Sequence, residues 1–156
     1  MPKPAPEPEI VPPGENAIRS PLAESPAFLV RLAQLRAFDE FHRNFAGLGV
    51  TPAGFSVFAL IVANPGIRPG AIAEELRVKP SNVAVLVNGL VSAGLVRREA
   101  DQAELRASLL HPTAAGSRAW REMDRIHRDT DARFAAGLTP AERGQFVALL
   151  RKLLHR

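Results

Sequence analysis

The sequence of 156 residues contains no cysteine. This absence excludes disulfide bonds, thiolate zinc sites and any sensing of peroxides by a thiol of this chain. No apolar run approaches the roughly 18 residues that a membrane-spanning helix needs. The amino terminus, Met1-Pro2-Lys3-Pro4, also lacks the charged and apolar regions of a signal peptide. We therefore expect a cytoplasmic protein with no membrane partner.

Motifs of enzyme chemistry are missing as well. The chain has no nucleophile elbow, phosphate-binding loop or dinucleotide fingerprint. Its four histidines are scattered, and none has a metal-ligand spacing to a carboxylate that a helix would repeat, although His127 and Asp131 share a helical face at i, i+4. One such pair is more often surface packing than a zinc site. We expect no catalytic activity, no metal and no cofactor.

Composition and charge are those of a small basic globular protein. The length fits one domain, and 46% hydrophobic with 6% aromatic residues is ordinary for a packed core. Two of the 20 cations and four of the 16 anions lie in the first 26 residues, so the remainder carries a net charge of +6. An excess of positive charge suits a polyanionic partner.

Proline divides the chain into a tail and a helical body. Eight of the 14 prolines lie in the first 26 residues, which predicts an extended or disordered tail over residues 1–25. Proline at the first helical position loses no hydrogen bond, and five prolines stand where a helix should begin. They are Pro52, Pro69, Pro80, Pro112 and Pro140. Thr51 and Thr139 are placed to cap two of these helices.

Apolar periodicity completes the assignment of helices and strands. In 80–93, for example, Val83, Leu86, Val87 and Leu90 fall at i, i+3, i+4 and i+7, which predicts one buried face. We predict strands near 95–100 and 106–111, and helices at 26–46, 52–63, 69–77, 80–93, 113–136 and 140–155. The fold class is mostly α with a small β-wing. A short helix, a tight turn, a second helix and a hairpin together indicate a winged helix-turn-helix.

The same stretch resembles the MarR family of transcriptional regulators. The similarity is carried by LRVKPSNV at 76–83, LVNGL at 86–90 and AGLVRR at 93–98, which match the family's turn, recognition helix and first wing strand. Residues 101–116 are similar to its wing and the start of its next helix. The resemblance implies one MarR-like domain over 26–156, with a winged helix-turn-helix lobe at 51–112 and dimerisation helices at 26–50 and 113–156.

The resemblance also implies a homodimer that binds double-stranded DNA at a pseudo-palindromic operator. Within the predicted recognition helix, Ser81, Asn82 and Asn88 face away from the core, where they can enter a major groove. The full set of predicted DNA-binding residues is Lys79, Ser81, Asn82, Asn88, Arg97, Arg98 and Arg106. Alternatives stay open: Ser81 and Asn82 could bond to free amides at the helix start, Asn88 could bond within the fold, and the arginines could form a solvated hairpin.

The chain departs from the family pattern at several cationic positions. The wing tip, usually acidic-Arg-Arg, is Glu104-Leu105-Arg106, and Val85 replaces an arginine of the recognition helix. Asn88 and Gly89 stand in place of an Asp-Arg pair. These losses remove positive charge, so a second hypothesis stays open, namely a winged-helix module that binds a protein partner and has no ligand response.

The last predicted helix carries an apolar stripe that favours dimerisation. Its members are Phe146, Leu149, Leu150, Leu153 and Leu154. We expect them to bury against a second copy of the chain, although this helix could instead fold back on 113–136 within one chain.

A final set of residues predicts an effector site. Six of the eight phenylalanines lie between residues 28 and 58, on helices that line a crevice in the family. Phe38, His42, Phe45, Phe55 and Trp120 would give an apolar slot with a polar end. Such a slot suits an aromatic acid, a phenol or an acyl thioester, although the same residues could simply be packed in the core. The leading hypothesis is thus a ligand-responsive dimeric repressor.

Overall fold

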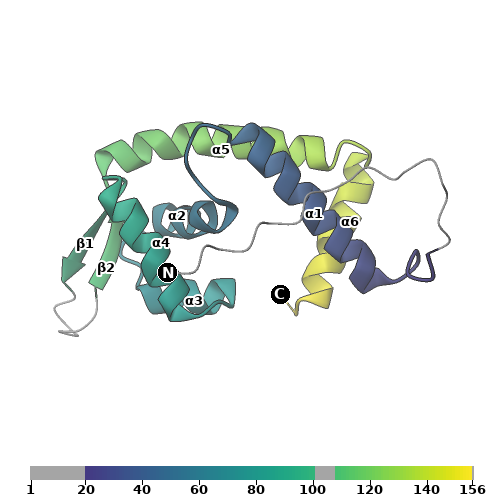
Figure 1. Ribbon diagram of the computed structural model, residues 1–156, viewed down its shortest axis with the longest axis horizontal. Coiled ribbons are helices and arrows are strands. Elements are labelled where there is room, and N and C mark those ends of the chain that lie inside the picture. The colour runs from purple at the N-terminus through teal and green to yellow at the C-terminus, as the bar shows by residue number, and fades with distance from the viewer. Residues whose placement is uncertain (1–19, 101–107, 156) are drawn as a thin grey trace. The chain divides into compact units, whose positions relative to one another are not determined.

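The computed structural model of the protein describes residues 20–100 and 108–155. Six helices and one two-stranded antiparallel sheet follow one another along these residues (Figure 1). In chain order they are α1 (Pro26–Asn44), α2 (Pro52–Ala63), α3 (Pro69–Leu76), α4 (Pro80–Ser92), β1 (Val96–Ala100), β2 (Ser108–Pro112), α5 (Ala114–Phe134) and α6 (Pro140–Leu153). The prediction of a mostly helical fold with a small β-wing is confirmed.

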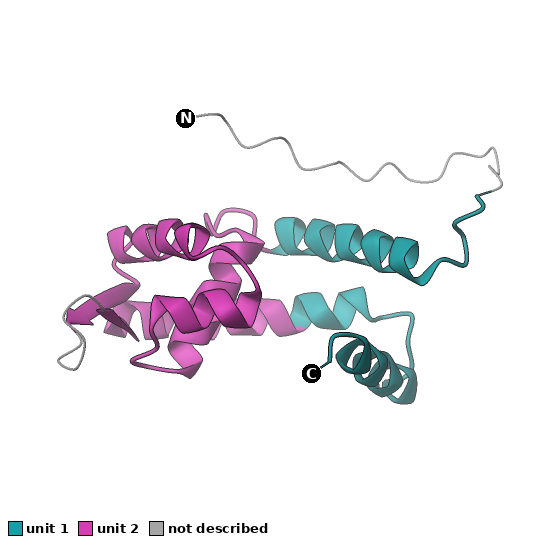
Figure 2. Cartoon of the chain, turned by 90° about the horizontal axis from the view of Figure 1, so that it is seen from below, with its two compact units in different colours: residues 1–44, 129–156 teal, residues 45–128 magenta. Residues whose placement is uncertain are grey.

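The chain divides into two compact units (Figure 2). Unit 1 comprises Met1–Asn44 and Asp129–Arg156, and unit 2 comprises Phe45–Arg128. Helix α5 contributes residues to both units. The predicted division at residues 51 and 112 into DNA-binding and dimerisation lobes remains a prediction.

Unit 2 holds the largest fully buried side chains of the described residues. Helix α4 packs against α2, α3 and β1, and α2 and α3 also contact β2. The largest fully buried side chains come from each of these elements, namely Val57, Phe58, Ile61, Ile72, Val83, Val87, Val96 and Leu110. Apolar side chains from α2, α3, α4 and the sheet are thus buried together in one core.

Most predicted helix starts are confirmed. Proline occupies the first turn of α2, α3, α4 and α6. The Thr51 hydroxyl accepts a hydrogen bond from the Gly54 amide at 3.1 Å. Thr139 forms a full capping box with Glu142, in which each side chain accepts a bond from the other residue's amide.

Pro112 was wrongly predicted to begin a helix. It ends β2 and pairs with Val96 of β1, while α5 begins at Ala114. Thr113 caps that helix instead, because its hydroxyl accepts a hydrogen bond from the Gly116 amide at 2.9 Å. A proline has no amide to donate, so the end of a strand tolerates it as well as the start of a helix does.

Helix ends fall up to two residues before the predicted ones. Arg77, predicted to be the last residue of a helix, adopts a left-handed conformation with φ of 53° and ends α3. Its amide bonds to carbonyl oxygens of the preceding turn, those of Ala73 and Glu74. This closure resembles the usual left-handed helix cap, although arginine replaces the more common glycine.

The wing is anchored to the helix pair by backbone hydrogen bonds. Strand β1 pairs with β2 from Val96 opposite Pro112 to Ala100 opposite Ser108. The Gly66 amide donates to the Leu110 carbonyl at 2.8 Å, and the Leu110 amide donates to the Ile67 carbonyl at 3.0 Å. The segment between α2 and α3 therefore adds a short second pairing, a bridge between Ile67 and Leu110 of β2. The predicted wing tip lies outside the described residues.

Unit 1 contains α1, the end of α5, α6 and the turn that precedes α1. Residues 20–25, predicted as part of the disordered tail, form a hydrogen-bonded turn, in which the Ser25 amide donates to the Leu22 carbonyl at 2.9 Å. The rest of that tail lies outside the described residues. None of the described helices is long and apolar enough to cross a membrane.

The apolar stripe of α6 is only partly covered within unit 1. Phe146 and Leu150 line a groove of about 400 Å³ together with Leu29, Val30 and Phe134. By contrast, Leu149 and Leu153 are 66% and 63% exposed. Part of the stripe thus packs within the chain, and part remains open to solvent.

Candidate functional site

Helix α4 presents an uncharged polar and apolar face away from the core. Val83 and Val87 are fully buried and Leu90 is nearly so. Ser81, Asn82, Val85, Asn88 and Gly89, which lie on the other side of the helix, are all exposed. The predicted direction of this face is therefore confirmed. Side chains on such a face are free to reach a partner without disturbing the core.

The start of α4 carries three of the predicted DNA-binding residues. Lys79 is the N-cap residue, and its side chain makes no capping hydrogen bond. Ser81 and Asn82 follow Pro80 in the first turn and are exposed. Within residues 20–100 and 108–155, neither side chain hydrogen-bonds to a backbone amide of the helix start, so the alternative role of satisfying those amides is not observed.

Asn88 connects the helix to the wing. Its side-chain oxygen accepts a hydrogen bond of 2.7 Å from the Arg98 guanidinium of β1. The prediction left open whether Asn88 bonds within the fold, and in this structure it does. The bond holds the positive charge of Arg98 beside the exposed face of α4, although Asn88 and Arg98 both remain accessible.

The neighbouring arginine of β1 is in a different environment. Successive residues of a strand point to opposite faces, so Arg97 points away from Arg98. Arg97 donates to the Glu99 carboxylate at 2.7 Å, and His111 lies 3.6 Å from the same carboxylate. The hydrogen bond and charge of Arg97, followed by the charge of His111, lower the pKa of Glu99. Glu99 therefore offsets part of the charge of Arg97. The remaining predicted arginine, Arg106, lies outside the described residues.

A clamp built on Thr113 fixes the wing relative to α4. The Thr113 hydroxyl donates to the Gly94 carbonyl at 2.7 Å, and its amide donates to the Leu95 carbonyl at 2.9 Å. Gly116 is buried against the same turn, and a Cβ added there would overlap the Leu95 carbonyl oxygen. The start of α5 is thereby tied to the turn between α4 and β1. The sequence signal was a threonine at the predicted start of the helix, which is typical of an N-cap.

Three of the five predicted effector residues meet in unit 2. Phe55 packs edge-on against Phe45 and stacks on Trp120, with ring centroids 5.3 Å apart in both pairs. Two residues that the sequence analysis did not assign to this site complete the cluster. The Phe58 ring lies 5.8 Å from Trp120, and the His127 ring lies 4.8 Å from Phe55. Trp120 and His127 are seven residues apart, on the same face of α5, and this spacing is the only sequence signal that could have placed His127 in the cluster.

The other two predicted effector residues belong to unit 1. Phe38 is half-buried and His42 is exposed, with its ring 6.2 Å from that of Phe41. Phe45, Phe55 and Trp120 of the predicted slot therefore lie in unit 2, whereas Phe38 and the predicted polar end, His42, lie in unit 1.

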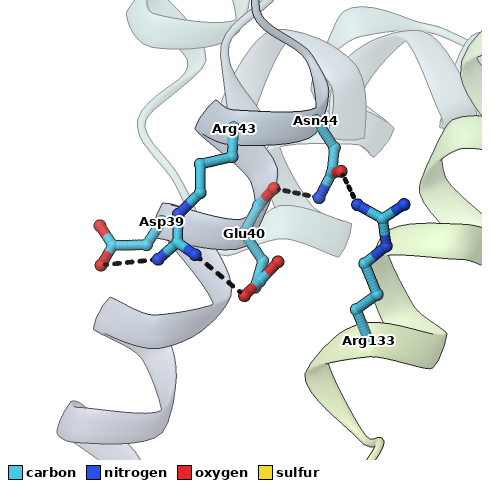
Figure 3. A network of polar contacts seen from close by, with 5 residues as sticks. All are labelled: Asp39, Glu40, Arg43, Asn44 and Arg133. Carbon is cyan, nitrogen blue, oxygen red and sulfur yellow. Dashed lines mark hydrogen bonds and ion pairs between the residues drawn. The ribbon is translucent and has the colours of Figure 1, made fainter.

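A polar network joins the ends of α1 and α5 in unit 1 (Figure 3). Arg133 donates to the Asn44 side-chain oxygen at 2.6 Å, and the Asn44 amide group donates to the Glu40 carbonyl at 2.6 Å. Arg43 lies 3.5 Å from the Glu40 carboxylate and 3.9 Å from that of Asp39. The charge of Arg43 is thus matched by carboxylates on its own helix.

Comparison with known proteins shows which proteins this chain is similar to. A model of the MarR family matches residues 48–107. The chain is 31% identical over 137 residues to the proposed transcriptional regulatory protein for the hcr operon of Thauera aromatica. The match covers 87% of this chain and 82% of that protein.

Solved structures agree with this result. The chain resembles the transcriptional repressor CouR bound to a 23-mer DNA duplex, with a TM-score of 0.81, 27% identity and coverage of 85% of this chain and 94% of CouR. It also resembles BpsR of Bordetella bronchiseptica, whose DNA binding is regulated by 6-hydroxynicotinic acid. That match has a TM-score of 0.78 and 25% identity, and covers 83% of this chain and 98% of BpsR.

Proposed function

Because the chain belongs to the MarR family of transcriptional regulators, we propose that it is a dimeric repressor, which binds a pseudo-palindromic operator and is released by a small aromatic effector. A regulator of this family is not an enzyme. The observation that carries the proposal is the exposed face of α4, on which Ser81, Asn82 and Val85 are held by a buried valine face behind them. A helix of this width fits a B-DNA major groove.

The proposed DNA contacts divide into base-reading and phosphate-binding groups. Asn82 in the first turn of α4 has the donor and acceptor needed to pair with an adenine edge, and Ser81 can reach a base or a phosphate. Lys79, Arg97 and Arg98 would position the protein on the phosphate backbone. Asn88 would act mainly through Arg98, whose guanidinium it holds at 2.7 Å. Arg106 would enter the minor groove beside the wing.

Dimerisation would supply the second half-site. Leu149 and Leu153 of α6 are largely exposed, and burial of such side chains against a second copy is favourable. A two-fold axis relates identical patches, so the two α4 helices would lie about 34 to 36 Å apart, one turn of B-DNA. We propose residues 26–50 and 113–156 as the dimerisation helices and 51–112 as the DNA-binding lobe.

The proposed effector is an aromatic acid, a phenol or an acyl thioester. Phe45, Phe55 and Trp120 already stack with one another, and an aromatic ring could join such a cluster favourably. The regulation of BpsR by an aromatic acid supports the same ligand class. Release from DNA requires only that the effector binds one spacing of the α4 helices better than another. A coupling of about 1 to 3 kcal/mol would change DNA affinity 5- to 150-fold.

The DNA-binding proposal is tested with an operator selected from random duplexes by the full-length protein. Asn82→Ala should lower the discrimination between this operator and scrambled DNA by about 1 to 3 kcal/mol if its pairing is bidentate. Lys79→Ala should instead weaken binding to both duplexes and make the salt slope shallower by about one per subunit. Lys152→Ala, which removes an exposed cation from α6, is the matched control. Full discrimination by Asn82→Ala would refute the groove assignment, and failure to select any sequence would favour a protein partner.

The effector proposal is tested by thermal shift with aromatic acids, phenols and acyl thioesters, followed by DNA release with the hits. Trp120→Ala and His42→Ala should reduce the ligand response more than DNA affinity, whereas His155→Ala should change neither. Trp120→Phe keeps an aromatic ring in the cluster and controls for lost packing. Equal stabilisation of the parent and of the Trp120 and His42 variants would place the ligand elsewhere.

A further inference from the structure

The most exposed large hydrophobic side chain of the described residues lies on the proposed reading face. Val85 is 68% exposed, although it stands near the middle of α4. Rotation by 100° per residue places it almost opposite the buried Val83 and Val87, between Ser81 and Asn82. It also lines a groove of about 290 Å³ in unit 2.

The fold gives no reason for the choice of residues at this position and one turn further along. Valine is a weaker helix former than alanine, and an exposed valine gains little from packing. Gly89, at i+4 from Val85, lowers helix stability further, yet an added Cβ there would meet no atom within 4 Å. Neither residue is therefore required by the core. Both are explained if another molecule covers this part of the helix.

The charge pattern of α4 indicates what that molecule presents. Cations stand at the edges of the face, with Lys79 before its first turn and the Arg98 guanidinium held beside Asn88. The middle of the face, around Val85, carries no charge. A duplex groove has the complementary pattern, because phosphates line its rims and uncharged base edges form its floor. In the major groove the apolar feature of those edges is the thymine C5-methyl group.

We propose that Val85 reads a thymine methyl group in each operator half-site, and that Gly89 allows the helix backbone to approach the base edges closely. This inference rests on the proposed DNA-binding function and adds a specific base to it. The branched valine side chain has few rotamers, so its methyl groups are held in place for such a contact. Glycine permits close approach because it has no side chain. Together with an adenine read by Asn82, the contact predicts an operator whose half-sites contain A·T pairs under the first two turns of α4.

The experiment removes single methyl groups from the DNA. Each thymine of the selected operator is replaced by deoxyuridine at symmetric positions, which keeps base pairing but deletes the C5-methyl. When the contacted thymine is replaced in both half-sites, the full-length parent should lose affinity about fourfold per half-site. This is the effect of losing the burial of about one methylene-sized group. Val85→Ala should bind the thymine operator as weakly as the parent binds the deoxyuridine operator, and should show no further loss on that substitution. Alanine favours helix, so this variant should fold.

Val91→Ala is the matched control, because this valine lies on another face of the same helix and is half-buried. It should retain the full sensitivity to deoxyuridine. An equal loss in the parent and Val85→Ala would assign the methyl contact to another side chain and overturn the proposal. Insensitivity of the parent at every thymine would overturn it as well, while specific operator binding would still stand. If the parent selects no operator, both this inference and the proposed function fail.

Discussion

Replacement of Gly116 by alanine should destabilise the protein, although alanine is the better helix former. Gly116 lies in the first turn of α5, where its missing side chain lets the helix approach the Leu95 carbonyl. The obstacle to a Cβ is backbone and cannot rotate away as a flexible side chain would. To accommodate alanine, α5 or the turn between α4 and β1 must shift, and the hydrogen bonds of Thr113 to Gly94 and Leu95 would be strained.

The magnitude follows from three contributions. Overpacking of a close contact costs about 1 to 3 kcal/mol, and each weakened hydrogen bond of Thr113 costs about 0.5 to 1.5 kcal/mol. Alanine returns up to about 1 kcal/mol of helix propensity. The net loss should be about 1 to 6 kcal/mol, which corresponds to a fall in Tm of about 2 to 24 °C for a chain of this length.

Urea unfolding followed by circular dichroism measures this loss. Gly144→Ala is the matched control, because Gly144 stands inside α6, is exposed, and has no atom within 4 Å of an added Cβ. That variant should gain up to about 1 kcal/mol. If Gly116→Ala were as stable as the parent, or gained as much as Gly144→Ala, the close approach of α5 to the turn before the wing would be refuted.

Three further predictions concern α6 and the connection from α4 to the wing. Deletion of residues 140–156 should give aggregates or unfolded monomer in sedimentation, and a well-folded monomer of the full-length chain at micromolar concentration would contradict the dimer. Hydrogen bonds from the Thr139 amide and hydroxyl lower the pKa of Glu142. The stability that these bonds give the folded protein is therefore present above the ordinary glutamate pKa and is lost as the pH falls through the lower pKa of the folded state. The stability difference between the parent and Glu142→Gln should therefore be full at about pH 6 and should shrink progressively as the pH falls below the ordinary glutamate pKa. A difference that does not change with pH in acid would disprove the linkage. Arg98→Ala should make the salt dependence of operator binding shallower by about one per subunit. Asn88→Ala leaves that cation in place and should keep the slope of the parent. Identical slopes for the two variants would show that Arg98 does not contact DNA.

Helix positions were predictable because their signals are local. A proline in the first turn with a threonine before it needs only a few neighbouring residues to act, as at Thr51 and Thr139. The buried face of α4 followed from the period of Val83 and Val87 alone.

Features that depend on distant partners were harder to predict. Pro112 carries the same local signal as the other prolines, but its pairing with Val96 made it the end of a strand. The need for glycine at 116 arises from the Leu95 carbonyl, which no local pattern reveals. The position of Asn88 allowed two roles, and only the placement of Arg98 across the turn showed the bond between them.

The candidate effector site shows the same limit. Its aromatic residues in unit 2 were identified from composition, and Phe55 and Trp120 do stack. His127 was missed because its contact with Phe55 depends on the packing of α5 against α2. Periodicity gives the face of each helix, but it does not determine which faces of distant helices meet.

Hydroxyl-radical footprinting of the selected operator tests most directly whether two chains bind DNA through their α4 helices. A symmetric dimer should protect two equivalent half-sites whose centres lie about 10 base pairs apart, one turn of B-DNA. Asn82→Ala should weaken both protections to the same extent. A single protected site, or two protections without symmetry, would contradict a two-fold dimer that reads the major groove with α4.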